Sequence, residues 1–235
     1  MKIKQRSRGA ATIEFYLVGF FVLLPLLMGI LQTGMLMVAK NTVNLAALAA
    51  ARAGAASSGD PAEMQRAVVS SLTPLYVASG IRILGGSGFT ELGKANYTTI
   101  MPAAYAAARV AWASPTNKLT VLNPSAASFA DFAINDPATK LRLIPHTNLV
   151  DDSKIGANSK QTRADALLLK VELRYCYPMV FPIIDKLIAQ VLQSDLSASV
   201  DDRLCYSNLG GSHGIPIKSQ AIVRMTTPAI QANFK

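Results

Sequence analysis

The chain has 235 residues, of which 51% are hydrophobic and 16% charged, and its formal net charge is +9. Four positive charges lie within the first eight residues, and the remainder shows no cluster of Lys and Arg with interleaved aromatic residues. This distribution argues against a nucleic-acid-binding protein. The length beyond the first 57 residues suits one compact domain with a hydrophobic core of its own.

A long apolar segment lies near the N-terminus. No acidic or basic residue occurs between Glu14 and Lys40, a stretch of 25 residues, which is enough for a helix to cross the roughly 30 Å hydrocarbon core of a bilayer. The hydrophobic region of a cleaved secretory signal has only about 7–15 residues, so we expect a retained anchor. The helix should run from about Thr12 to Ala56 and be kinked or locally unwound at Pro25.

The residues that precede this segment predict its orientation. The leader carries Lys2, Lys4, Arg6 and Arg8, and the positive-inside rule keeps such a leader in the cytoplasm. The rest of the chain is then expected on the other side of the membrane.

Glu14 is the unusual residue at the start of the anchor. A carboxylate drawn toward the centre of a membrane costs about 2.5 kcal/mol or more. One interpretation is an ordinary charge at headgroup level. The other is that the chain is cut between Gly9 and Ala10, so that Glu14 becomes the fifth residue. It would then meet the new ammonium group of a neighbouring subunit.

A basic leader, Gly9, the sequence Ala-Ala-Thr-Ile-Glu-Phe at residues 10–15 and a membrane helix together resemble the processing signal of type IV pilins and pseudopilins. The start of the chain is most similar to TadE-like minor pseudopilins of the tight adherence (Tad, or Flp pilus) system. The alanine-rich stretch 44–56 also resembles the segment after the membrane span in these proteins. The strong resemblance covers residues 6–57, and a weaker one covers 167–178 and 214–228.

The resemblance implies a role and a set of partners. A prepilin peptidase would cut after Gly9, and Glu14 and Phe15 would serve assembly with neighbouring subunits. The partners would be other Tad pseudopilins and the assembly platform of the bacterial inner membrane, with the C-terminal domain in the periplasm. Association with the cell surface or the pilus after processing stays open. The alternative is an uncleaved single-pass inner-membrane protein with a periplasmic binding or adaptor domain.

No residue pattern in the chain predicts catalysis. His146 and His213 have no neighbouring metal ligands, and the acidic pairs 151–152 and 201–202 lack the spacing of a calcium loop. No nucleophile motif or nucleotide fingerprint occurs. We therefore expect a non-enzymatic protein without cofactor or metal.

Two cysteines occur, Cys176 and Cys205, and they do not form a Cys-x-x-Cys motif. They are either a pair of small buried thiols or a disulfide. Export to an oxidising periplasm favours the disulfide.

Residue periodicity predicts an α+β fold in which helices cover a small antiparallel sheet, after a leader (1–9) and a long helix (10–57). The globular part then spans 58–235. Asp60, Pro61 and Glu63 predict a capped helix start, and residues 166–177 alternate between apolar and charged side chains, as in a half-buried strand. We expect helices at 61–72, 91–113, after Ser125 and at 181–192, strands at 119–122, 141–144, 166–177 and 217–225, a glycine-rich turn at 80–88, and loops at 148–163 and 201–214.

Overall fold

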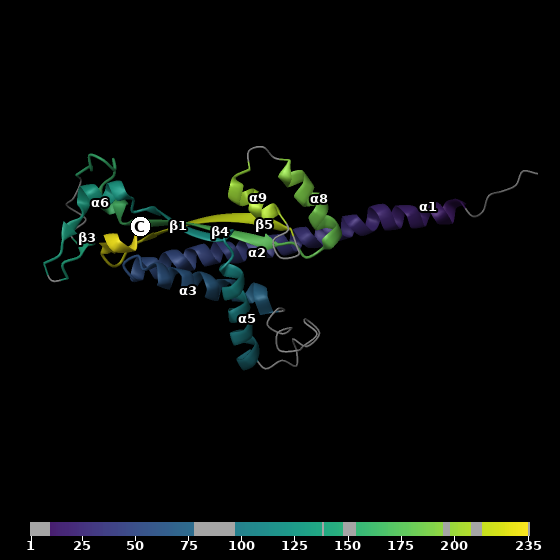
Figure 1. Ribbon diagram of the computed structural model, residues 1–235, viewed down its shortest axis with the longest axis horizontal. Helices are drawn as coiled ribbons and strands as arrows, with labels where there is room; N and C mark the ends of the chain where they lie inside the picture. The colour runs from purple at the N-terminus through teal and green to yellow at the C-terminus, as the bar shows by residue number, and fades with distance from the viewer. Residues whose placement is uncertain are drawn as a thin grey trace, which may run out of the picture. The chain divides into compact units, whose positions relative to one another are not determined.

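The computed structural model describes residues 10–77, 97–137, 139–147, 154–194, 198–207 and 213–234. The chain forms two compact units. The first combines Met1–Val38 with Tyr177–Pro216, and the second combines Ala39–Cys176 with Ile217–Lys235. A long N-terminal helix and small antiparallel sheets with helices give an α+β chain (Figure 1). The predicted fold class is confirmed.

The first unit is helical. It holds α1 (Ala10–Val18), a π-helical turn (Gly19–Leu23) and the first part of α2 (Leu24–Ala56), followed later in the chain by α8 (Pro182–Gln193) and α9 (Val200–Tyr206). The prediction of a loop over 201–214 is wrong at its start, because 201–206 belong to α9. The Ser199 hydroxyl accepts a hydrogen bond from the Asp202 N–H at 3.2 Å, and two acidic residues in the first turn favour helix at this position.

The second unit contains a three-stranded sheet in the order β1-β4-β5. β1 (Lys118–Asn123) pairs antiparallel with the central strand β4 (Leu168–Pro178), with Leu119 opposite Leu173. β5 (Gly214–Arg224) is the other neighbour, and the Gln220 amide donates a 2.6 Å hydrogen bond to the Glu172 carboxylate. The strands predicted at 119–122, 166–177 and 217–225 therefore exist, with shifted ends.

The alternation predicted for β4 is present on its apolar side. Five side chains of that side are buried, namely Leu169, Val171, Leu173, Tyr175 and Tyr177. On the opposite side Lys170 and Glu172 are half-buried, but Arg174 is only 8% exposed. The half-buried strand predicted for 166–177 is therefore wrong at Arg174, because this central strand is covered on both faces at that position.

The second part of α2 packs through small side chains. Its buried face recurs at helical spacing and consists of Ala39, Val43, Ala46, Ala47, Ala50, Ala51, Gly54 and Ala55. At Gly54 an added Cβ would lie 2.8 Å from the Leu169 side chain of β4 and 2.5 Å from the Met64 sulfur of α3 (Pro61–Leu72). The alanine-rich stretch therefore lets the helix backbone approach the sheet and α3 closely.

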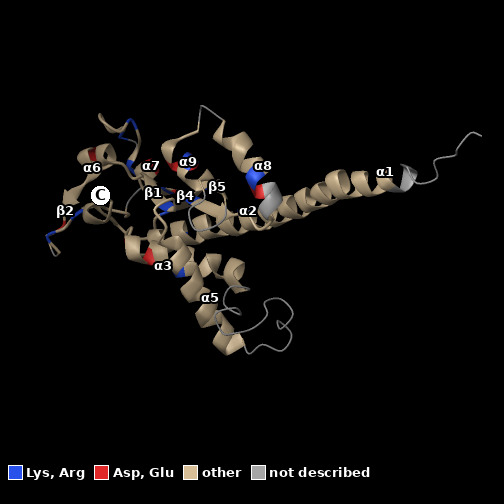
Figure 2. Ribbon diagram, turned by 45° about the vertical axis from the view of Figure 1, so that its right-hand side comes forward, with Lys and Arg blue, Asp and Glu red and all other residues tan. Residues whose placement is uncertain are grey.

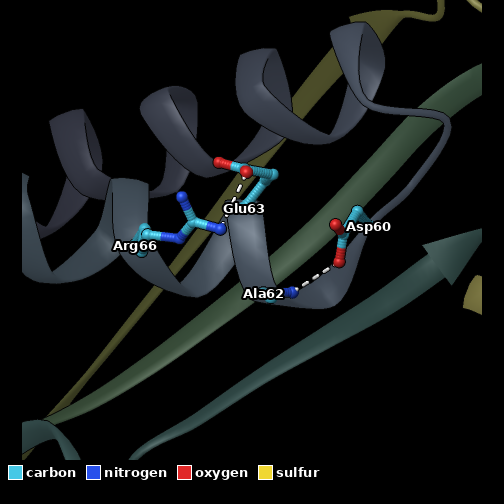
Figure 3. A network of polar contacts seen from close by, with 4 residues as sticks. All are labelled: Asp60, Ala62, Glu63 and Arg66. Carbon is cyan, nitrogen blue, oxygen red and sulfur yellow. Dashed lines mark hydrogen bonds and ion pairs between the residues drawn. The ribbon is translucent and has the colours of Figure 1, made fainter.

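The start of α3 follows the prediction in part (Figure 3). Asp60 is the N-cap and accepts a 2.9 Å hydrogen bond from the Ala62 N–H, with Pro61 in the first turn. Glu63 does not complete a capping box and instead forms a 2.8 Å ion pair with Arg66. The reason is that the Asp60 N–H already donates to the Ser57 carbonyl at 3.1 Å.

The remaining elements of the second unit are short. A second sheet has the order β2-β3-β6 (Ile134–Asn135, Arg142–Ile144, Ala229–Ile230), and only its middle strand was predicted. α5 (Tyr97–Trp112) contains Pro102, and α6 (Ala126–Phe132) follows its N-cap Ser125, where a helix was predicted. α7 (Arg163–Ala166) and single 3-10 turns at Thr73–Tyr76 and Gln231–Asn233 complete the described elements. The predicted turn at 80–88, the start of the helix predicted at 91 and residues 148–153 lie outside the described residues.

The C-terminal segment donates hydrogen bonds to the end of α2. The Ala55 carbonyl accepts hydrogen bonds from the Thr226 N–H (3.1 Å) and the Thr227 hydroxyl (2.9 Å). The next turn places Gly59 at φ +83, directly against the ring of Phe234. A residue at the far end of the chain therefore packs on the turn that follows the long helix.

The conformation of Gly59 in this turn leads to our first prediction. Gly59→Ala should destabilise the protein by about 1–3 kcal/mol, because a Cβ at positive φ is strained and also displaces Phe234. The measurement is thermal or denaturant unfolding of the purified protein, followed by circular dichroism.

The neighbouring Ser58 is the matched control. It also has positive φ (57°), so Ser58→Gly should leave stability unchanged or raise it by up to about 1 kcal/mol. Equal unfolding curves for wild type and Gly59→Ala would contradict the prediction.

Candidate functional site

The candidate site is the N-terminal segment around Ala10, Glu14 and Phe15. Ala10 is the first residue of α1, whereas Gly9 lies outside the described residues. Glu14 and Phe15 are both exposed, and Phe15 is 74% exposed. Among the described residues Glu14 has no hydrogen-bond or ion-pair partner. The chain therefore presents this carboxylate on the helix surface, open to a group from another molecule.

A π-helical turn follows at Gly19–Leu23, where the Leu24 N–H donates to the Gly19 carbonyl. Pro25 lies two residues after the end of this turn. Proline lacks the N–H that would bond the carbonyl four residues earlier, and its ring clashes with that carbonyl. The wider turn absorbs this defect without ending the helix. The predicted local unwinding at Pro25 is thus confirmed.

The helical segment from α1 into α2 exposes almost all of its apolar side chains. The most hydrophobic stretch of Ile13–Ala56 is long and apolar enough to cross a membrane, and none of it is buried within the chain. In Figure 2 the ribbon of α1 and early α2 is largely tan, whereas blue and red residues mark the helices and strands of the remainder. Such an exposed apolar surface is typical of a membrane anchor rather than of a core helix.

Residues 9–52 match one family model, described as TadE-like protein. The N-terminal segment is TadE-like. This finding confirms the resemblance inferred from the opening residues, and the matched region includes Gly9, Ala10, Glu14, Phe15 and the whole apolar stretch. No curated protein and no solved structure matches the chain.

The match connects this segment with the Tad pilus system. It ends at residue 52 and leaves the whole of 58–235, including both sheets, outside the matched region. The long apolar helix is consistent with single-pass membrane anchoring.

Beyond the apolar run, α2 carries a contact that the sequence analysis missed. Gln32 is only 2% exposed, and its side-chain oxygen accepts hydrogen bonds from the Val180 N–H (3.2 Å) and the Phe181 N–H (3.4 Å). These two residues lie directly before α8. A lone glutamine at the end of an apolar stretch is the only sequence signal, and it does not reveal a partner about 150 residues away.

The other predicted residues are dispersed over the chain. Cys176 lies in β4 and Cys205 in α9, and neither is a free thiol. The ring of His213 forms a 2.7 Å hydrogen bond with the Tyr206 carbonyl. Asp202 is buried and takes part in the N-cap of α9. Within the described residues no group of three or more His, Cys, Asp or Glu side chains is placed to hold a metal.

The globular part has an open groove between α3 and α5. Its lining combines aromatic and basic side chains, namely Arg66, Tyr105, Arg109 and Trp112, together with Ala62, Gln65 and Val69. Trp112 is half-buried. The groove is a candidate surface for the binding or adaptor function.

A carboxylate outside the candidate site stabilises the turn at residues 156–160. Asp131 of α6 accepts hydrogen bonds from the Ser159 N–H (2.7 Å), the Asn158 N–H (3.0 Å) and the Asn158 amide (2.6 Å). These bonds, led by that of the Ser159 N–H, lower the pKa of Asp131 from 3.8 to about 2. The bonds favour the charged form, so ionised Asp131 stabilises the folded state.

The resulting pH dependence is our second prediction. Because the pKa is lower in the folded state, the stabilising contribution is complete above pH 4 and is lost as the pH falls from about 4 to 2. Asp131→Asn should lower stability at neutral pH and flatten its decline in that acid range. Unfolding curves measured between pH 2 and 7 test this, and identical slopes for wild type and variant would refute it.

Proposed function

We propose that this protein is a minor pseudopilin that supports assembly of a Flp-type (tight adherence) type IV pilus. It would be made as a prepilin in the inner membrane and cut by a prepilin peptidase between Gly9 and Ala10. The observation that carries the proposal is that the TadE-like match at residues 9–52 coincides with a long, exposed apolar helix that is able to cross a membrane.

The proposed arrangement has three parts. Residues 1–9 form a cytoplasmic leader, 10–57 form the membrane and projecting helix, and 58–235 form a periplasmic domain. The leader charges support this orientation through the positive-inside rule. The mature protein would contact other Tad pseudopilins and the inner-membrane assembly platform.

The size of the globular part supports a specialised role. The proposed domain covers most of the chain, and it contains both sheets and its own buried core. Major Flp pilins are little more than the helix, so a chain with a large domain is a poor candidate for the bulk filament subunit. A tip, initiation or adaptor position, without enzymatic activity, fits the domain better.

The mass of the mature N-terminus tests the proposal. Protein purified from its own cell should begin at Ala10, and its precursor should accumulate when the prepilin peptidase is deleted. Deletion of the gene should abolish or strongly reduce pili, and the wild-type gene should restore them. A native protein that begins at Met1 would overturn the pseudopilin assignment.

The second candidate is an uncleaved single-pass inner-membrane protein with a periplasmic binding or adaptor domain. The groove between α3 and α5, with Arg66, Arg109 and Trp112 in its lining, favours a binding role for the domain. This candidate predicts a native N-terminus at Met1 and pilus formation that is independent of cleavage after Gly9.

Periplasmic exposure also leads to our third prediction. We propose that Cys176 and Cys205 form a disulfide in the cell, which agrees with the absence of a free cysteine from the structure. Such a bond should stabilise the protein by about 3–4 kcal/mol, since it restricts the unfolded chain. Cys176→Ser should therefore lower the free energy of unfolding by about 2–5 kcal/mol.

Peptide mapping without reduction is the direct measurement for the disulfide. Peptides that hold Cys176 and Cys205 should be linked in protein alkylated during extraction. The double variant with both cysteines changed to Ser should match Cys176→Ser in stability, because either change removes the same bond. Two alkylated thiols in exported protein would refute the pairing.

A further inference from the structure

The helix α8 exposes two of its large apolar side chains. Leu187 and Val191 are 54% and 70% exposed, whereas Asp185 and Ala189 are 5% and 1% exposed. Among the described side chains, the side of α8 that faces the rest of the chain holds the buried Asp185 and Ala189, together with the half-buried Ile188 and Leu192. Two large apolar side chains, one turn apart on the same face, point away from it.

The exposed half of α8 presents two strips of side chains that run parallel to the helix axis. At 100° per residue, Leu187 and Val191 form an apolar strip, while the exposed Lys186, Gln190 and Gln193 form a polar strip beside it. An exposed surface with adjacent apolar and polar strips is typical of a helix that lies in a membrane interface, with one strip toward lipid and the other toward water.

A second observation places the start of α8 at the outer edge of the proposed membrane span. The side chain of Gln32 accepts the N–H groups of Val180 and Phe181, at 3.2 and 3.4 Å. Gln32 comes 18 residues after Glu14, which is about 27 Å along a helix and close to the roughly 30 Å of a hydrocarbon core. With Glu14 at one headgroup level, Gln32 lies near the other.

The direction of α8 agrees with this placement. In both Figure 1 and Figure 2, α8 runs across the axis of α1 rather than along it. If α1 and early α2 cross the membrane, a helix that leaves them sideways at Gln32 runs along the membrane surface. Val180, at the point of departure, is itself 54% exposed.

We propose that α8 is a membrane-interface helix whose Leu187 and Val191 insert into the outer face of the bilayer that the N-terminal helix crosses. The occupant of the apolar strip is lipid, and the polar strip with Lys186 faces headgroups and water. The inference rests on the membrane insertion of residues 13–31 that the proposed function requires. It adds a second attachment of the chain to the same membrane.

Tryptophan quenching in vesicles tests the proposal. The full-length protein with Trp112→Phe, which removes the single native tryptophan, is reconstituted into phosphatidylethanolamine–phosphatidylglycerol vesicles, with or without lipids brominated along their acyl chains. Val191→Trp and Leu187→Trp should each lose fluorescence when brominated lipid is present. Both positions are exposed, so neither variant disturbs the core, and either one is sufficient if the other does not fold.

Two further variants separate the possible outcomes. Lys186→Trp, about 140° around the helix from Val191, should be quenched less than Val191→Trp. Ile30→Trp reports on the span itself and should be quenched strongly. Quenching at Ile30 without quenching at Val191 and Leu187 would overturn the inference while leaving the anchor intact. A blue-shifted emission in that case would show that a protein surface or a second copy, and not lipid, covers the strip. No quenching at Ile30 would overturn the anchor and with it the inference.

Discussion

Gly9→Lys is expected to leave the protein as an uncut precursor in the inner membrane and to abolish its contribution to pilus assembly. The proposed cleavage site joins Gly9 to Ala10, four residues before Glu14 and the apolar run, so the peptidase would act next to the membrane. We expect a peptidase pocket next to the membrane to accept little bulk at this position, so a lysine side chain should not fit. Mass spectrometry of the protein from its own cell should show an intact N-terminus.

Two variants control this experiment. Gly9→Ala adds a single methyl group and should still be cut, at least in part. Gly19→Ala changes a glycine farther along the same helix, where an added Cβ meets nothing within 4 Å, and should be cut like the wild type. A Gly9→Lys protein with the normal mature mass and normal pili would contradict the pseudopilin proposal itself.

Much of the second unit could be predicted because its signals are local. The alternation of Leu169, Val171 and Leu173 with charged residues needs only neighbouring positions, and it correctly predicted the central strand. The caps at Asp60 and Ser125 are equally local, since each side chain bonds an N–H two or three residues away. The apolar run and Pro25 likewise predicted the long helix and its local unwinding.

Features that depend on distant parts of the chain could not be predicted. Strands of two or three residues, such as β2 and β6, carry no periodicity of their own. Thr226 and Thr227 bond the Ala55 carbonyl from 171 and 172 residues away. The apolar residues of α8 show the same limit, because helical spacing identifies Leu187 and Val191 as one face but does not say what covers it.

The candidate site was predicted mainly from the order of residues along the chain. Its proposed ion pair would form between two subunits and not within one. A single chain places Glu14 and Phe15 on the surface of α1 but contains no partner for the carboxylate among its described residues. Gln32 was missed for the opposite reason, since its partners, the N–H groups of Val180 and Phe181, lie within the chain but far away in sequence.

Glu14→Ala is expected to separate cleavage from assembly. The variant should still be cut after Gly9, at least in part, because the peptidase acts before subunits associate. The mature protein should then fail to support pilus assembly. Its mass and the number of pili per cell, measured in the same strain, give the two readouts.

The physical reason is the cost of an unpaired charge near hydrocarbon. Glu14 lies about 6 Å along the helix from Ala10, and it is exposed without a partner among the described residues. In the proposed bundle of staggered subunits, the ammonium group of a mature Ala10 would reach the Glu14 carboxylate of its neighbour, which would offset the cost of holding either charge there. Glu14→Gln keeps the size of the side chain and removes its charge, so it should fail like Glu14→Ala, whereas Glu14→Asp should retain part of the function. Normal piliation by Glu14→Ala or Glu14→Gln would show that assembly does not depend on this ion pair.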